Sequence, residues 1–155
     1  MEDRATRPPT LLVLPSYLAG HVSRIGHRRL AAALGEHGLR LPHFAVLAAL
    51  ADYGPLAQHR LADSLGLNRS HLVGYLDDIE KRGYVQRERD PDDRRRQRVA
   101  LTPPGLDLLD RLREIARRSQ DEYLHVLSEE ERRTLVDLLR RVVVADDEAH
   151  LATDA

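Results

Sequence analysis

The chain has 155 residues with no cysteine, 32% charged and 4% aromatic residues, and a formal net charge of −1. This length suits a single domain over residues 1–155, and the lack of cysteine excludes disulfides, thiolate metal sites and thiol redox sensing. A net charge near zero argues against a protein that coats nucleic acid indiscriminately, and no apolar run in the sequence is long enough to predict a membrane span.

The N-terminal segment MEDRATRPPTLLVLP predicts a polar, proline-containing arm over residues 1–10. Its apolar run is short and we find no signal-peptide cleavage site, so we expect a cytoplasmic protein. The first helix is expected over Pro15–Leu34, ending near Gly35 or Gly38. A stripe at helical spacing is predicted to face the core, and it consists of Leu18, Val22 and Ile25.

A second helix is predicted to begin with Pro42 at its first position and to end near Tyr53, before a Gly-Pro pair. Its packed face consists of Phe44, Leu47, Leu50 and Ala51. The next helix is expected to end at Gly66, and its inner residues are Leu56, Leu61, Ala62 and Leu65. Ala57 gives this helix no side-chain cap, at a cost of about 0.5–2 kcal/mol if nothing else replaces it.

The helix that follows is expected to have two distinct faces. Asn68 is suited to cap its first turn. The buried stripe is predicted to contain Leu72, Val73, Leu76 and Ile79. The other face carries Arg69, Ser70, His71, Gly74, Tyr75 and Asp78, and Gly83 ends the helix. Two helices joined by a short glycine-containing turn, the second with an exposed polar start, indicate a helix-turn-helix.

A two-stranded hairpin is predicted after this unit, because Val85, Arg87 and Arg89 alternate with other side chains and Val99 and Leu101 share one face. The intervening DPDDRRRQR begins with turn residues and is too charged to be buried. From position 82 to 98, seven arginines against four acidic residues give a net charge of +3. Such local charge suits a phosphate backbone or a narrow minor groove, and the alternative is a solvated hairpin.

Two further helices are expected after the hairpin. Thr102 is predicted to cap the first, with Pro103 and Pro104 in its first turn, and the helix should continue to about Val126. Its apolar residues include Leu106, Leu109, Leu112, Ala116 and Tyr123. Ser128 and Glu131 predict a capping box at the start of the last helix. The stripe of that helix is Leu135, Leu138, Leu139, Val142 and Val143, and the tail DDEAHLATDA is expected to be loose.

The run from Leu61 to Gly105 resembles the winged helix-turn-helix of MarR-type bacterial transcriptional regulators. The similar stretches are LADSLGL, DDIEKRGYVQR and DPDDRRRQRVALTPPG, with an Asp-x-Arg element at Asp93 and Arg95 as the most specific part. This resemblance implies a mainly α fold with a small β-hairpin wing, built as a winged helix-turn-helix region at 41–102. It also implies dimerisation helices at 15–38 and 103–145, and hence a homodimer. The alternative is a monomer with a larger helical core.

DNA contacts are expected from two places. The first half of the second helix should reach base edges in the major groove through Arg69, Ser70, His71 and Tyr75, and Asn68 should lie near a phosphate at the helix start. Arg69 can pair either with a guanine edge or with a phosphate. The family motif implies that Arg95 enters the minor groove and that Asp93 orients it. Phosphate contacts are expected from Arg94, Arg96 and Arg98, although each of them can instead be a solvated side chain.

The resemblance further implies a site for a small aromatic or phenolic effector near the dimerisation helices. The candidates on the first two helices are Tyr17, His21, Arg24, His43 and Phe44. Alternatively, these residues form contacts between subunits or a solvated face. The eight histidines show no metal-ligand spacing, so we predict neither a metal site nor another cofactor.

We therefore expect a sequence-specific regulator that binds double-stranded DNA, acting as a ligand-responsive repressor on a near-palindromic operator. The chain has neither a GxSxG motif nor a phosphate-binding glycine loop, so it is not expected to be an enzyme. The alternative function is a winged-helix module for protein–protein interaction without sequence-specific DNA binding, because fold alone does not fix function. The arginine-rich wing favours DNA.

Overall fold

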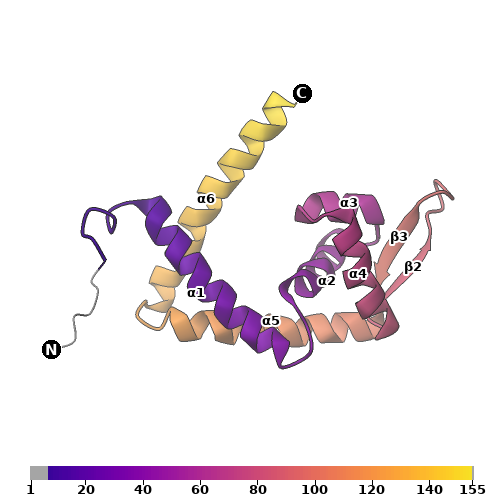
Figure 1. The fold of residues 1–155 in the computed structure, drawn as a ribbon, viewed down its shortest axis with the longest axis horizontal. Helices are drawn as coiled ribbons and strands as arrows, with labels where there is room; N and C mark the ends of the chain where they lie inside the picture. The colour runs from indigo at the N-terminus through magenta and orange to yellow at the C-terminus, as the bar shows by residue number, and fades with distance from the viewer. Residues whose placement is uncertain (1–6, 155) are drawn as a thin grey trace. The chain divides into compact units, whose positions relative to one another are not determined.

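The computed structural model describes residues 7–154, so residues 1–6 of the expected N-terminal arm lie outside it (Figure 1). The elements in chain order are α1 (Pro15–Gly35), α2 (Leu41–Tyr53), β1 (Leu56–Ala57), α3 (Gln58–Leu65), α4 (Arg69–Lys81), β2 (Val85–Arg89), β3 (Gln97–Leu101), α5 (Pro103–Tyr123) and α6 (Glu129–Thr153). The predicted mainly α fold with a small β wing is confirmed. Within the described residues, no helix combines the length and the apolar character needed to cross a membrane.

The chain divides into two compact units, one ending at Ser119 and one beginning at Gln120. In the first unit, β2 and β3 form the predicted antiparallel hairpin, which extends away from α3 and α4 (Figure 1). A third strand, β1, places Leu56 opposite Val99 and Ala57 opposite Arg98. The sheet therefore has one strand more than the predicted hairpin, and the prediction that Leu56 lies in a helix is wrong because it belongs to β1. Pairing with β3 keeps the backbone extended until α3 begins.

The core of the first unit lies between α2, α3, α4, the sheet and α5. Its largest fully buried side chains are Leu34, Leu39, Leu47, Leu61, Leu72, Leu76, Ile79, Leu109, Leu112, Val46, Val85 and Val99. Three residues predicted to be buried are not: Leu18 and Val22 of α1 are 40% and 38% exposed, and Val73 of α4 is 38% exposed. Val73 lies at the edge of a narrower stripe than predicted. The buried residues of α1 are only Gly26 and Leu34, so its N-terminal half is not core in the single chain.

The short turn between α3 and α4 follows the sequence prediction. Gly66 ends α3 in the left-handed conformation, with φ of 61°. The side chain of Asn68 caps α4 by accepting the main-chain N–H of Ser70 at 2.9 Å. Pro42 is the second rather than the first residue of α2, because Leu41 is already helical.

Long-range polar contacts fix the end of α4 and the base of the wing. The Arg82 guanidinium donates to the main-chain carbonyls of His37 and Gly38 at 3.2 and 3.1 Å. The Thr102 hydroxyl donates to the carbonyl of Gly83 at 2.6 Å and accepts the N–H of Gly105 at 3.1 Å, as its predicted capping role requires. These contacts join the last turn of α4 to the segment before α2 and to the start of α5.

The first turn of α5 packs directly on the backbone of the wing. A Cβ atom at Gly105 would lie 1.9 Å from the carbonyl oxygen of Tyr84, closer than real side chains approach. The same carbonyl accepts the N–H of Thr102 at 3.1 Å, so moving it would cost a hydrogen bond. Glycine is therefore required at this position by close approach.

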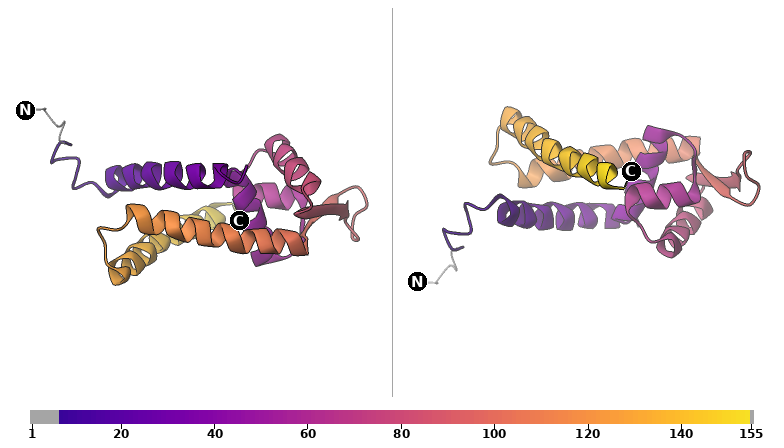
Figure 2. Two further views of the ribbon diagram at one scale, coloured as in Figure 1. Left: turned by 90° about the horizontal axis from the view of Figure 1, so that it is seen from below. Right: turned by 90° about the horizontal axis from the view of Figure 1, so that it is seen from above.

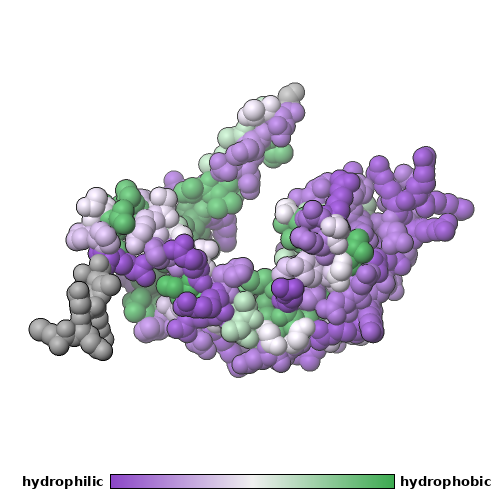
Figure 3. Space-filling view, viewed as in Figure 1, coloured by the Kyte–Doolittle hydropathy of each residue, from purple (hydrophilic) through white to green (hydrophobic). Residues whose placement is uncertain are grey.

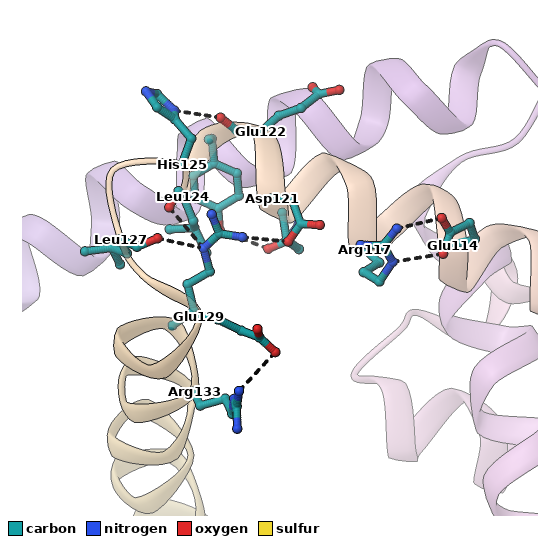
Figure 4. Close-up of polar contacts among 12 residues, drawn as sticks. Glu114, Arg117, Asp121, Glu122, Leu124, His125, Leu127, Glu129 and Arg133 are labelled. Atoms are coloured by element: carbon teal, nitrogen blue, oxygen red, sulfur yellow. Dashed lines mark hydrogen bonds and ion pairs between the residues drawn. The ribbon is translucent and has the colours of Figure 1, made fainter.

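In the second unit, Arg132 organises the turn between the last two helices. Its Nε donates to the carbonyls of Leu124 and Leu127 at 3.1 and 3.2 Å, and its Nη1 donates to Asp121 at 2.7 Å (Figure 4). α5 ends at Tyr123, before the predicted end near Val126, and the Arg132 guanidinium binds two carbonyls of the turn that follows.

The last helix begins with the predicted capping box: the Ser128 hydroxyl accepts the N–H of Glu131 at 3.1 Å, and the Glu131 carboxylate accepts the N–H of Ser128 at 2.8 Å. The tail predicted to be loose is helical through Thr153, because it contains helix-favouring Ala, Glu and Leu and neither Gly nor Pro. No residue of α6 is buried. Its exposed large apolar residues are Val136, Leu138, Leu139, Val142, Val143, Val144 and Leu151 (Figure 3).

Candidate nucleic-acid interface

The first turns of α4 carry the five residues predicted to contact DNA from this helix. Arg69, Ser70 and His71 are exposed, and Tyr75 is half-buried one turn further along. Asn68 Oδ1 accepts both the N–H and the hydroxyl of Ser70, at 2.9 and 2.6 Å. The Asn68 side chain is therefore committed to capping, while the other side chains remain on an accessible polar face.

A buried histidine connects this helix to α2. His43 is 3% exposed, its Nδ1 accepts the N–H of Arg40 at 2.9 Å, and its Nε2 lies 3.0 Å from Asp78 Oδ2 without the alignment of a good hydrogen bond. Its ring meets Tyr75 edge to face, with centroids 5.3 Å apart. Burial lowers the pKa of His43, the Asp78 carboxylate opposes this effect, and the Arg82 and Arg40 charges add to it. Since Nδ1 accepts, Nε2 carries the proton of the neutral ring.

The wing tip presents three consecutive arginines. Asp93 shapes the turn: its carboxylate accepts the N–H of Arg95 at 3.0 Å, and its main-chain carbonyl accepts the N–H of Arg96 at 2.9 Å. The Arg95 guanidinium lies 3.8 Å from that carboxylate, and its side chain is 94% exposed. Arg94 is exposed as well. The hairpin extends beyond the helices of its unit, so these guanidinium groups are accessible to a large partner (Figure 2).

Two other arginines of the hairpin are engaged within the fold. Arg98 donates to Glu88 at 2.8 Å, and its side chain is only 34% exposed. Arg87 is 17% exposed and pairs with Glu80 and Asp77 of α4. The side-chain hydrogen bond between Arg87 and Glu80 is the main reason why the pKa of Arg87 is raised and the pKa of Glu80 is lowered. The Arg87 pairs hold the wing against α4, and the pair with Glu88 inside the hairpin leaves Arg98 less free than the arginines at the tip.

A hollow of about 250 Å³ lies between α3, α4 and the wing, and the sequence did not predict it. Its lining residues are Gln58, His59, Arg69, Leu72, Arg96 and Gln97. Only the two arginines were expected to touch DNA. The sequence did predict one feature beside the hollow, namely that Ala57 leaves the start of α3 without a side-chain cap. Nothing in the sequence indicates that the three elements meet there.

The five effector candidates fall into two groups. On α1, the Tyr17 and His21 rings meet with centroids 4.4 Å apart, and Arg24 Nη2 lies 2.9 Å from His21 Nδ1. Partial desolvation, then the nearby arginines, lower the pKa of His21. His43 instead contacts α4, and Phe44 packs at the edge of the core. Within residues 7–154, no group of three or more potential ligand side chains is placed to hold a metal ion.

Comparisons with known proteins agree on one family. The model of the MarR family matches residues 37–96. A putative transcriptional regulatory protein for the hcr operon of Thauera aromatica is 33% identical over 105 residues, covering 68% of this chain and 63% of the relative's length. The HTH-type transcriptional repressor NicR of Pseudomonas putida is 31% identical over 134 residues, covering 84% of this chain and 85% of that protein.

A solved structure supports the same relationship. The crystal structure of the PcaV transcriptional regulator from Streptomyces coelicolor, in complex with its natural ligand, superposes with a TM-score of 0.70. The two chains are 29% identical, and the match covers 91% of this chain and 99% of the other.

Proposed function

This chain belongs to the MarR family of transcriptional regulators, and from that premise we propose that it represses transcription by binding a near-palindromic operator as a homodimer. Its relatives are named as regulators of transcription, and a protein of this family is a DNA-binding regulator and not an enzyme. A repressor acts where the bacterial chromosome lies, so the proposed location is the cytoplasm.

The observation that carries the proposal is an accessible polar helix face beside an arginine-tipped wing. His71 on α4 suits a base edge in the major groove, where a recognition helix places its first turns, and Arg69 at the start of the helix suits the adjacent phosphate backbone. Arg95, with its nearly free guanidinium, suits the minor groove. Asp93 holds the turn that presents it, and Arg94 and Arg96 suit the flanking phosphates.

The homodimer is supported by apolar surface that each unit leaves exposed. In the second unit, none of the apolar residues of α6 is buried. In the first unit, Leu18 and Val22 of α1 are more than a third exposed. Contiguous exposed apolar surface favours association with another protein surface. A second copy would also place two recognition helices in successive major grooves, roughly 34–36 Å apart.

The proposed effector is a small aromatic or phenolic anion. The α1 group of Tyr17, His21 and Arg24 combines a ring, a nitrogen acceptor and a guanidinium that can pair with a carboxylate. A bound effector would favour a spacing of the recognition helices that no longer fits successive grooves. His43 and Phe44 remain part of the proposed set. Contacts between subunits are the alternative role for the α1 group.

Footprinting across the DNA that flanks the gene tests this function. We expect a protected near-palindrome whose two half-sites are about one helical turn apart, with binding that weakens steeply as salt increases. Sedimentation of the free protein should give a dimer. Absence of duplex binding at low ionic strength, together with a captured protein partner, would favour the winged-helix module for protein–protein interaction.

A further inference from the structure

We propose that the hollow between α3, α4 and the wing seats one phosphodiester of the operator backbone, held jointly by Arg69 and Arg96. The inference rests on the proposed function, and it adds a shared backbone contact to it. The hollow has room for a phosphate group and several waters, since about 250 Å³ is several times the roughly 30 Å³ that one water occupies in the liquid.

The lining of the hollow has the chemistry of an anion site. The two arginines come from different elements, Arg69 from the first turn of α4 and Arg96 from the residue before β3. Gln58 and His59, from the first turn of α3, add an amide and an imidazole. None of the lining residues is acidic. Guanidinium groups are the side chains that bind phosphate oxygens best, through paired N–H donors.

Both arginines can change partners at little cost. Arg69 lies 3.6 Å from Asp63, and the two side chains are 70% and 63% exposed. Arg96 lies 3.5 Å from Asp93 in another open pair, with the arginine 57% exposed. Exposed ion pairs at such distances contribute little to stability. A phosphate can therefore replace each carboxylate without disturbing the fold.

The position of the hollow favours the DNA backbone as the source of the phosphate. In a docked helix-turn-helix, the second helix enters the major groove while the first crosses the adjacent backbone. α3 is that first helix, and its start has no side-chain cap and no acidic residue in its first turn. A phosphate oxygen placed there could accept main-chain N–H groups that Ala57 leaves uncapped.

The test combines protein variants with duplexes in which single phosphates are replaced by neutral methylphosphonates, scanned symmetrically across both half-sites. On the normal duplex, Arg69→Ala and Arg96→Ala should each weaken binding by about tenfold or more. At one methylphosphonate position, both substitutions should lose their effect, so that each variant binds that duplex with the same affinity as the wild-type protein. Arg60→Ala is the control, because Arg60 is an exposed arginine of α3 that does not line the hollow. Its affinity for the duplex should still fall when that phosphate is replaced by a methylphosphonate.

Several outcomes would overturn the proposal. The proposed shared phosphate contact is wrong if the two substitutions lose their effect at different methylphosphonate positions, or if no single position removes the effect of both. Either result can occur while the protein still binds DNA. If inorganic phosphate at constant ionic strength shifts the amide resonances of Gln58 and His59 while no duplex position silences the arginines, the hollow binds a free anion instead. Failure of the wild-type protein to bind any duplex would refute the proposed function itself.

Discussion

Replacing Arg95 with alanine separates DNA binding from stability more cleanly than any other single change. The side chain is 94% exposed, and the Asp93 carboxylate lies 3.8 Å from its guanidinium. The main-chain N–H that Asp93 accepts remains in the variant, so the turn at the wing tip is preserved. We expect the free energy of unfolding to change by less than about 0.5 kcal/mol.

The effect on operator affinity should be much larger. A specific arginine contact with a base edge contributes about 1–3 kcal/mol. A homodimer loses two such contacts, so the cost should be roughly 2–6 kcal/mol if the contacts are additive. Since about 1.4 kcal/mol corresponds to tenfold, Arg95→Ala should weaken binding by between roughly 30-fold and 10⁴-fold.

Fluorescence anisotropy with a labelled operator at fixed salt measures this effect, and Arg140→Ala is the matched control. Arg140 is also exposed, at 67%, and has a similarly loose partner, with Asp137 3.5 Å away. Both substitutions remove one positive charge per chain, so the net charge of the protein changes equally. Equal affinities for the two variants would refute the assignment of Arg95 to the minor groove. A large loss of thermal stability in Arg95→Ala would refute the structural reasoning behind it.

Three further predictions concern the interior and the α4 face. Because burial lowers the pKa of His43, the unfolded chain protonates first as pH falls below about 6.5, so the free energy of unfolding should decline until the pH passes the folded pKa. Urea titrations of His43→Gln, which can retain the capping contact, should show a smaller decline. Gly105→Ala should cost roughly 2–3 kcal/mol or more, because its Cβ would overlap the Tyr84 carbonyl, and calorimetry should show a lower Tm. Gly74→Ala has nothing within 4 Å of the added Cβ, so it should raise Tm by helix propensity but weaken operator binding if DNA approaches closely there.

Local chemistry made most of the fold predictable. The glycine after α3, the Asn68 cap and the Ser128–Glu131 capping box act within a few residues, and the structure confirms each of them. The strand at Leu56 was not predictable in the same way, because its partner at Val99 is distant in sequence and the strand is only two residues long. Exposed apolar residues such as Val22 cannot be distinguished from core residues by periodicity alone.

The candidate site shows the same limit. The arginines at the wing tip were predicted from their composition and motif, and the structure places them at an exposed turn. The sequence predicts His43 as an effector ligand, but it does not predict the contact that His43 makes with α4. Its partner is Asp78 on a different helix, and only the packing of α2 against α4 brings them within 3.0 Å. The hollow beside α3 likewise exists only once three separate segments have come together.

The bare apolar surface of α6 has a consequence for gene control. If a second copy covers that surface, then below the dimer dissociation constant the number of dimers grows with the square of the chain concentration. Operator occupancy would then rise abruptly as newly made chains accumulate, and it would fall abruptly when cell growth dilutes them. The helix would give the regulator a threshold in copy number, independent of any small molecule.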